Sequence, residues 1–263
     1  MFLIDLLSSL PLWLLALVLT VWMIGVALGA LALVRRLILP ELRLRYEDAY
    51  FAAAVVQSVM LMYGLIAALT AVGVWQRYSD VSGVVSAEAT AIASFWRDLG
   101  GYPEPLRTGT RDLLRGYSEQ VVNDAWPKQR AGQVPREGVE WMDRIQARLF
   151  SFEPVTESQK ILHAEAIGAF NELVQRRRQR LDSVHAALPS VLWWVLLPGA
   201  MGSIVLCAFF YVQDARFHTF FMVGLAWFIA MVLFVIIALD RPFTGGMGIS
   251  AESYQLVIDH HMK

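Results

Sequence analysis

The chain has 263 residues, a formal net charge of −1, 57% hydrophobic and 17% charged residues, and a mean hydropathy of +0.49. This composition is typical of an integral membrane protein and unusual for a soluble domain. The near-neutral balance excludes nucleic-acid binding through overall charge, so no nucleic-acid partner is expected. The single cysteine, Cys207, excludes an intrachain disulfide framework and a cysteine-rich metal site.

Four apolar runs have close to the roughly 20 residues that a helix needs to cross a bilayer. They extend over residues 12–34, 50–75, 188–211 and 217–239. Short connections join the first run to the second and the third to the fourth, so two antiparallel hairpins are predicted. The opening run has no basic flank or small-residue cleavage site and is too long for a signal peptide, so we expect a retained span.

The segment between the hairpins, residues 79–187, carries most of the charge and has helical apolar spacing, as in the stripe Leu162, Ala166, Ala169 and Leu173. Thr156 and Gln159 have the spacing of a capping box. About four helices are predicted here, the last running unbroken towards the third span. The prediction is an all-α membrane protein with a transmembrane hairpin in 1–78, a soluble helical domain in 79–187, a second transmembrane hairpin in 188–241 and a tail in 242–263.

Sequence signatures of enzymes are missing: there is no GxxxxGK[ST], HExxH, GxSxG or CxxC motif. The glycine-rich stretch FTGGMGIS follows no strand, so a turn is expected there. His163 with Glu165, and His260 with His261, lack metal-ligand spacing and a third partner. We therefore expect no enzymatic activity, no metal and no cofactor.

The second span has two unlike faces on a helical wheel. One face is bulky and apolar, which suits lipid. The other carries small and polar residues and must meet protein or water, because an amide such as that of Gln57 is costly against hydrocarbon. Close helix packing and a pore wall both explain this face. The candidate wall residues are Gln57, Met60, Gly64, Ala67 and Ala71, although a shifted register would place Met62 and Ile66 inside instead.

Gly25 and Gly29 in the first span form a GxxxG motif, which lets helices approach closely. Packing within the protomer is the favoured interpretation, and a contact between subunits is the alternative.

Positive charge leaves the membrane orientation undecided, because counts on the two sides nearly tie. One side carries Arg35, Arg36, Arg43, Arg45 and Arg216, and the other carries Arg77, Arg176, Arg177, Arg178, Arg180 and Arg241.

Four stretches, VSAEATAIASFWRDLGGYPEP, YSEQVVNDAWP, RRRQRLDSVHAALPSVLW and LDRPFTG, resemble the bestrophin-like family of bacterial membrane proteins in order and spacing. The resemblance extends from about residue 35 to the C-terminus. A more distant resemblance links RYEDAYFAAAVVQSVMLMYGLIAALTAVGVWQRY and ALDRPFTG to the second span and the post-span turn of the bestrophin anion channels. The acidic calcium-binding run of those channels has no counterpart in TGGMGIS, so calcium gating is not implied.

The resemblance implies a homo-oligomeric, pentameric channel that favours inorganic anions, lies in the inner membrane and is lined by the second span. It also implies that the soluble domain and both termini are cytoplasmic. The alternative is a non-conducting membrane scaffold whose soluble domain binds a protein partner. Three roles remain open for the basic cluster Arg176, Arg177, Arg178 and Arg180: contact with anionic lipid headgroups, pairing with acids such as Glu172 or Asp182, and attraction of anions to a pore mouth.

Overall fold

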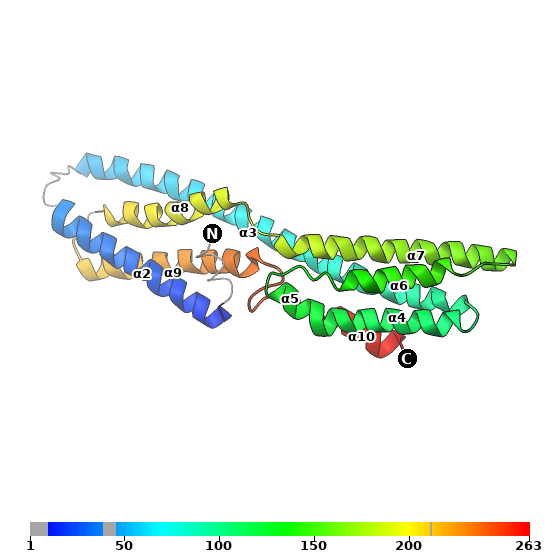
Figure 1. The fold of residues 1–263 in the computed structure, drawn as a ribbon. Helices are drawn as coiled ribbons and strands as arrows, with labels where there is room; N and C mark the ends of the chain where they lie inside the picture. The colour runs from blue at the N-terminus through cyan, green and yellow to red at the C-terminus, as the bar shows by residue number, and fades with distance from the viewer. Residues whose placement is uncertain (1–9, 39–45, 211) are drawn as a thin grey trace. The chain divides into compact units, whose positions relative to one another are not determined.

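The computed structural model describes residues 10–38, 46–210 and 212–263, and every regular element in these ranges is a helix (Figure 1). The predicted all-α class is confirmed. The chain divides into two compact units. The membrane unit comprises the described residues of Met1–Gln76 and Ala187–Asp240, and the soluble unit comprises Arg77–Ala186 and Arg241–Lys263.

Four helices are long and apolar enough to cross a membrane, as predicted. They are α2 (Leu12–Leu33, followed by the π-helical turn η1, Val34–Ile38), the first part of α3 (Tyr46–Asp98), α8 (Ser190–Ala208) and α9 (Ala215–Asp240). Three residues of the predictions lie outside the described residues. They are Arg43 and Arg45, in the first connection, and Tyr211, which is the predicted end of the third span.

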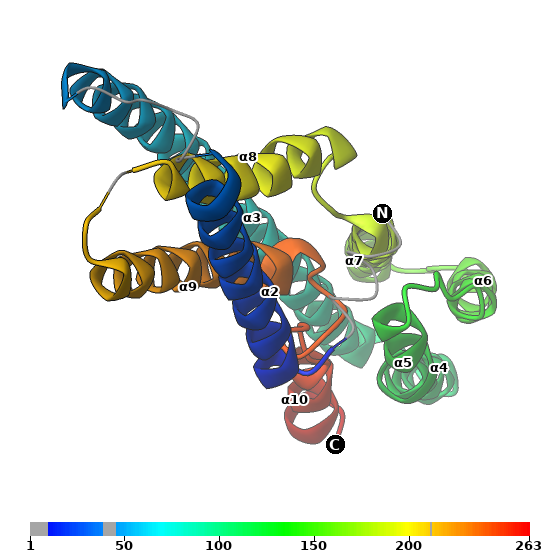
Figure 2. The same cartoon turned by 90° about the vertical axis from the view of Figure 1, so that its left-hand side faces the viewer.

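In the membrane unit, α2 packs against both helices of the second hairpin and crosses them in Figure 2. Its buried stripe repeats every four residues: Leu15, Leu19, Met23, Ala27 and Leu31. This spacing keeps one side of the helix towards its neighbours. The start of α8 is tied to the end of α9, because the Leu188 N–H donates to the Asp240 Oδ1 at 2.6 Å.

The second span does not end as a separate helix near Trp75. Helix α3 continues without a break for 53 residues to Asp98, so it contributes to both units. The helix that precedes the third span, by contrast, ends before that span begins. Helix α7 (Glu157–Asp182) ends in the short turn η4 (Ser183–His185), and Pro189 precedes α8. The prediction of an unbroken run into the third span is therefore wrong, because a helix does not readily continue into a proline.

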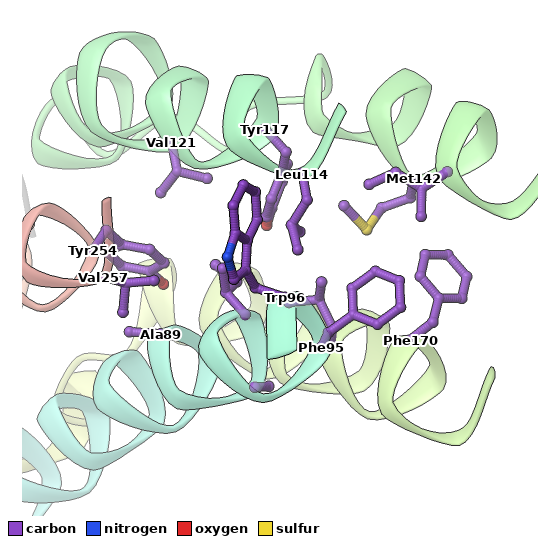
Figure 3. Packing of buried hydrophobic residues seen from close by; sticks show 14 of the residues in the cluster. Ala89, Phe95, Trp96, Leu114, Tyr117, Val121, Met142, Phe170, Tyr254 and Val257 are labelled. Carbon is purple, nitrogen blue, oxygen red and sulfur yellow. The ribbon is translucent and has the colours of Figure 1, made fainter. Parts of the chain in front are cut away.

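The soluble unit is built from the second part of α3 and the helices that line up along it in Figure 1. They are η2 (Leu99–Gly101), α4 (Leu106–Gln120), η3 (Val121–Ala125), α5 (Trp126–Arg130), α6 (Gly138–Phe150), α7 and α10 (Glu252–His261). Their shared core includes Phe95, Leu114, Met142 and Phe170 (Figure 3). The predicted capping box is confirmed at the start of α7, where the Gln159 N–H donates to the Thr156 Oγ1 at 3.2 Å.

The C-terminal segment after Asp240 belongs to the core of the soluble unit instead of forming a separate tail. The Trp126 indole N–H donates to the Ile249 carbonyl at 3.1 Å. The ring of Trp126 also meets Phe243 and Tyr254, at centroid distances of 5.7 and 5.5 Å. These contacts with Trp126 hold the C-terminal segment in the core of the soluble unit.

Candidate functional site

The membrane part of α3 packs within the protomer along one narrow stripe. Its buried or half-buried members are Val56, Met60, Tyr63, Ala67, Thr70 and Val74, spaced three or four residues apart. A helix turns about 100° per residue, so this spacing keeps the stripe on one side of the helix.

This stripe meets α8 at two points. The ring of Tyr63 lies so close to Gly199 that a Cβ at that glycine would be 2.7 Å from the ring carbon Cδ2. Nearer the end of α8, the sulfur of Cys207 is 3.4 Å from that of Met60. Gly199 thus provides the space that lets the aromatic ring approach the helix backbone.

The predicted pore-wall residues divide between this stripe and its flank. Gln57 and Gly64 are exposed and Ala71 is partly exposed, whereas Met60 faces α8 and Ala67 is 3% exposed. A side chain buried in one protomer stays buried in any assembly of protomers, so Ala67 does not line a path for ions. The wheel placed it there because small residues occur in packing seams as well as in pore walls.

The rest of this span is uncovered. Only 11% of the apolar window of α3 is buried, against 28% to 39% for the other three spans. Leu61, Met62, Leu65 and Leu69 are all exposed. The amide of Gln57 is also exposed, and it has no hydrogen-bond partner among the described residues.

Three exposed or partly exposed residues, Gln57, Gly64 and Ala71, are seven residues apart. Two helical turns separate neighbours, so the three form one line about 21 Å long beside the buried stripe. Met62 and Ile66 flank the stripe on its other side. The protomer thus presents two distinct candidate faces, one small and polar and the other bulky.

Gly25 and Gly29 do not pack closely within the protomer. No described atom lies within 4 Å of a Cβ built at either glycine. The buried stripe of α2 runs through Met23 and Ala27 instead. The interpretation of close packing within the protomer is therefore corrected, and the alternative, a contact between subunits, stays a prediction.

A buried ion pair lies at the centre of the soluble unit. The Arg180 guanidinium on α7 donates to both oxygens of Glu88 on α3, with Nε–Oε2 at 2.6 Å and Nη2–Oε1 at 3.2 Å. The Tyr117 hydroxyl on α4 donates to Glu88 Oε1 at 2.6 Å. Glu88 is 0% exposed and Arg180 is 1% exposed. One carboxylate therefore joins three helices.

Aromatic rings enclose the guanidinium of this pair. Its carbon lies 5.9 Å from the ring centre of Trp126 and 5.8 Å from that of Tyr254. Burial acts to lower the pKa of Arg180, but the charge of Glu88, with Tyr254 and Tyr117, raises that pKa well above its usual value. Burial and the charge of Glu88 also raise the pKa of Tyr117 and of Tyr254 far above the usual range. The arginine thus stays charged and both tyrosines stay neutral at physiological pH.

The four arginines of the predicted basic cluster do not form one exposed surface. Arg180 is buried against Glu88, and Arg177 is buried with its guanidinium over Gly138. Arg176 forms an ion pair with Glu172 at 3.2 Å, and Arg178 is exposed. Contact with lipid or anions is therefore wrong for Arg180, because its guanidinium is enclosed inside the unit.

The apolar stripes themselves carry a sequence signal for this pair. On α7 the buried positions Ala166, Phe170 and Leu173 continue at the same spacing into Arg177 and Arg180. On α3, Glu88 falls in the run of Val81, Val85, Ile92 and Phe95. An acid and a base that both occupy apolar stripe positions are expected to meet, since burying either one alone is very costly.

The remaining candidates for chemistry have structural surroundings. His163 Nδ1 lies 2.7 Å from the Tyr102 hydroxyl. Gly245, in the glycine-rich stretch, has φ of +74°, as a turn requires. Within the described residues, no three His, Cys, Asp or Glu side chains are close enough together to hold a metal ion.

Comparison with known proteins adds a family and a fold. A family model described as "Bestrophin-like domain" matches residues 10–254. No protein of curated function matches the sequence. The chain is similar in fold to a bacterial bestrophin homologue from Klebsiella pneumoniae. One crystal structure of a point variant of that protein has 9% identity and a TM-score of 0.72, and covers 94% of this chain and 97% of the other. A second structure, solved by Zn-SAD phasing, has 11% identity and a TM-score of 0.71, with coverage of 94% and 96%.

Proposed function

The chain belongs to the bestrophin-like family, and from this premise we propose that it assembles as a homo-oligomer, a pentamer, whose α3 helices line a path for ions that favours anions. The soluble unit and both termini face the cytoplasm, and the assembly lies in the inner membrane. Its chemistry is passive: the protein lowers the cost of moving an ion through the bilayer core.

The observation that carries this proposal is the uncovered membrane part of α3, above all the amide of Gln57. An amide facing hydrocarbon without a partner is costly, so it needs either water or a second copy of the chain. Lipid explains the bulky face of α3 but not this one. Five copies that turn the line of Gln57, Gly64 and Ala71 towards a common axis would meet this need.

Such an arrangement suits anions in a specific way. The Gln57 amide offers N–H donors to an ion that is losing water, and it carries no charge that would trap the ion. Gly64 and Ala71 leave room further along the same line. Arg178, the exposed member of the basic cluster, adds positive charge on the cytoplasmic side.

A cysteine scan of ion flux through the reconstituted full chain tests this function. The background is Cys207→Ala, because Cys207 is the single cysteine of the chain. Single cysteines at positions 57, 64 and 71 are compared with cysteines at 62 and 66, using a charged thiol reagent that does not cross lipid. Ala67→Cys is the matched control, since this buried site should resist the reagent in either register.

Block at 57, 64 and 71 with none at 62 and 66 is the expected result. Block at 62 and 66 alone would mean that the bulky flank lines the path. A protein that is monomeric in detergent by mass photometry and passes no ions would contradict the channel and leave the scaffold alternative.

Orientation has its own test. A reporter that is active only in the periplasm, fused within residues 131–135 between α5 and α6, should be silent. Strong activity would place the soluble unit on the other side of the membrane.

A further inference from the structure

The soluble unit contains a groove of about 700 Å³ between α3, α4 and α10 that the proposed channel does not use. Its volume falls in the range of small-molecule sites, roughly 300–1,000 Å³. One wall is apolar and includes Ala89 and Val257, which lie near each other in Figure 3. The groove is thus large enough for a small organic molecule with an apolar part.

The polar lining of this groove carries positive charge and hydroxyl groups. Its members include Arg97, Arg111, Ser94, Ser253 and His261. No carboxylate of the described residues lines it. Arg97 pairs with Asp98 at 3.5 Å, as Arg107 pairs with Glu104 and Arg176 with Glu172 elsewhere in this unit. Arg111 differs, because it has no acidic partner among the described residues.

No acid among the described residues pairs with Arg111, and contacts with Trp96 hold it in place. Its guanidinium lies 4.9 Å from the ring centre of Trp96, and its Nη2 donates to the Trp96 carbonyl at 3.2 Å. A Cβ at Gly100 would lie 3.0 Å from the same nitrogen, so the glycine makes room for it. Its Nε is buried and has no hydrogen-bond partner among the described residues. A partly buried guanidinium that has no carboxylate partner among the described residues favours an anion from outside.

We propose that this groove binds a small organic anion, a carboxylate or phosphate carried on an apolar group. Arg111 holds the oxyanion, Ser94 and Ser253 supply hydroxyl donors, and the Ala89 and Val257 wall takes the apolar part. Trp96 fixes the direction of the guanidinium before the ligand arrives, which reduces the ordering cost of binding.

Calorimetric titration of the purified full chain with phenyl phosphate and benzoate tests the site. We expect saturable binding in the range of about 0.1–1 mM for at least one of them. Inorganic phosphate should bind about tenfold more weakly, because it lacks the apolar part, and benzyl alcohol should not bind. Both comparisons use the same protein sample.

Two variants locate the binding. Arg111→Gln should weaken it about tenfold or more through loss of a charge-assisted contact. Arg115→Gln is the matched control, since Arg115 approaches the same Trp96 ring, at 5.6 Å, without lining the groove. Ser94→Trp should abolish binding by filling the groove, and it leaves Arg111 intact in case Arg111→Gln impairs folding.

Three results would overturn the proposal. The first is no saturable binding of either aromatic anion, and the second is equal loss in Arg111→Gln and Arg115→Gln. The third is that the protein binds no probe and that Arg111→Gln changes the mass of the oligomer. This result would mean that the groove is a contact between copies. None of these results depends on ion conduction, so the site and the channel can fail separately.

Discussion

The two parts of α3 have buried stripes of the same spacing, but their polar residues lie in different places relative to these stripes. In the membrane part the stripe runs from Val56 to Val74, and in the soluble part a stripe of the same spacing runs from Val81 to Phe95. Gln57 in the membrane part lies outside the stripe and is exposed, whereas Glu88 in the soluble part lies inside it and is paired. A polar residue on an apolar helix therefore indicates an external surface in one case and an internal ion pair in the other.

The largest expected effect breaks the ion pair of the soluble part. Arg180→Met leaves the Glu88 carboxylate buried without its partner. We expect a loss of about 3–5 kcal/mol in the free energy of unfolding, which is roughly 10 °C in Tm. Thermal unfolding of the full chain in detergent measures it.

Arg178→Met is the control for that variant, because Arg178 is exposed on the same helix and should change stability by about 0.5 kcal/mol or less. The double variant Glu88→Leu with Arg180→Met should recover part of the loss, since it removes both charges. Equal stability of Arg180→Met and Arg178→Met would contradict the buried pair.

A smaller effect sharpens the account of the membrane part. Ala67→Leu should cost about 1–3 kcal/mol, because it overpacks the seam of α3. Gly64→Leu should cost less within a protomer, since no described atom lies within 4 Å of a Cβ at Gly64. Its main effect should instead be on ion flux. Thermal unfolding and liposome flux of both variants check the contrast, and a larger stability loss for Gly64→Leu would reverse the assigned seam.

Alkaline pH should weaken the soluble unit in a graded way. Burial raises the pKa of Tyr102 to about 12, whereas an unfolded tyrosine has a pKa of about 10. The folded state therefore keeps its proton longer, and this contribution is complete below about pH 10 and is lost as the pH rises towards 12. Tyr102→Phe should flatten the fall of Tm between pH 9 and pH 11.5, and an unchanged slope would exclude this contribution.

The smallest effect concerns the surface pair Arg176–Glu172. Glu172→Gln should change the free energy of unfolding by about 0–0.5 kcal/mol, because both side chains are largely solvated. Thermal unfolding in low and high salt measures it. A loss comparable to that of Arg180→Met would mean that the basic cluster acts as one network.

Sequence periodicity was sufficient for the fold class and for the four spans, since a long apolar run has few other solutions. It was insufficient for the continuity of α3, because the change from apolar to polar outer surface near Arg77 looks like a boundary although the backbone does not break. It also misplaced Ala67, since a helical wheel shows which side chains are small but not which neighbour covers them. Arg180 was misplaced for a related reason: Glu88 lies 92 residues away in the chain, and only the fold brings the two together.

The most direct test of the central claim is the reversal potential of currents through planar bilayers that contain the purified full chain, under a tenfold KCl gradient. We expect currents above those of protein-free bilayers and a reversal potential displaced towards that of chloride. The variant Gln57→Leu should reduce the current without changing the mass of the assembly. A reversal potential near that of potassium would contradict the anion preference, and no current from a correctly assembled protein would contradict the channel itself.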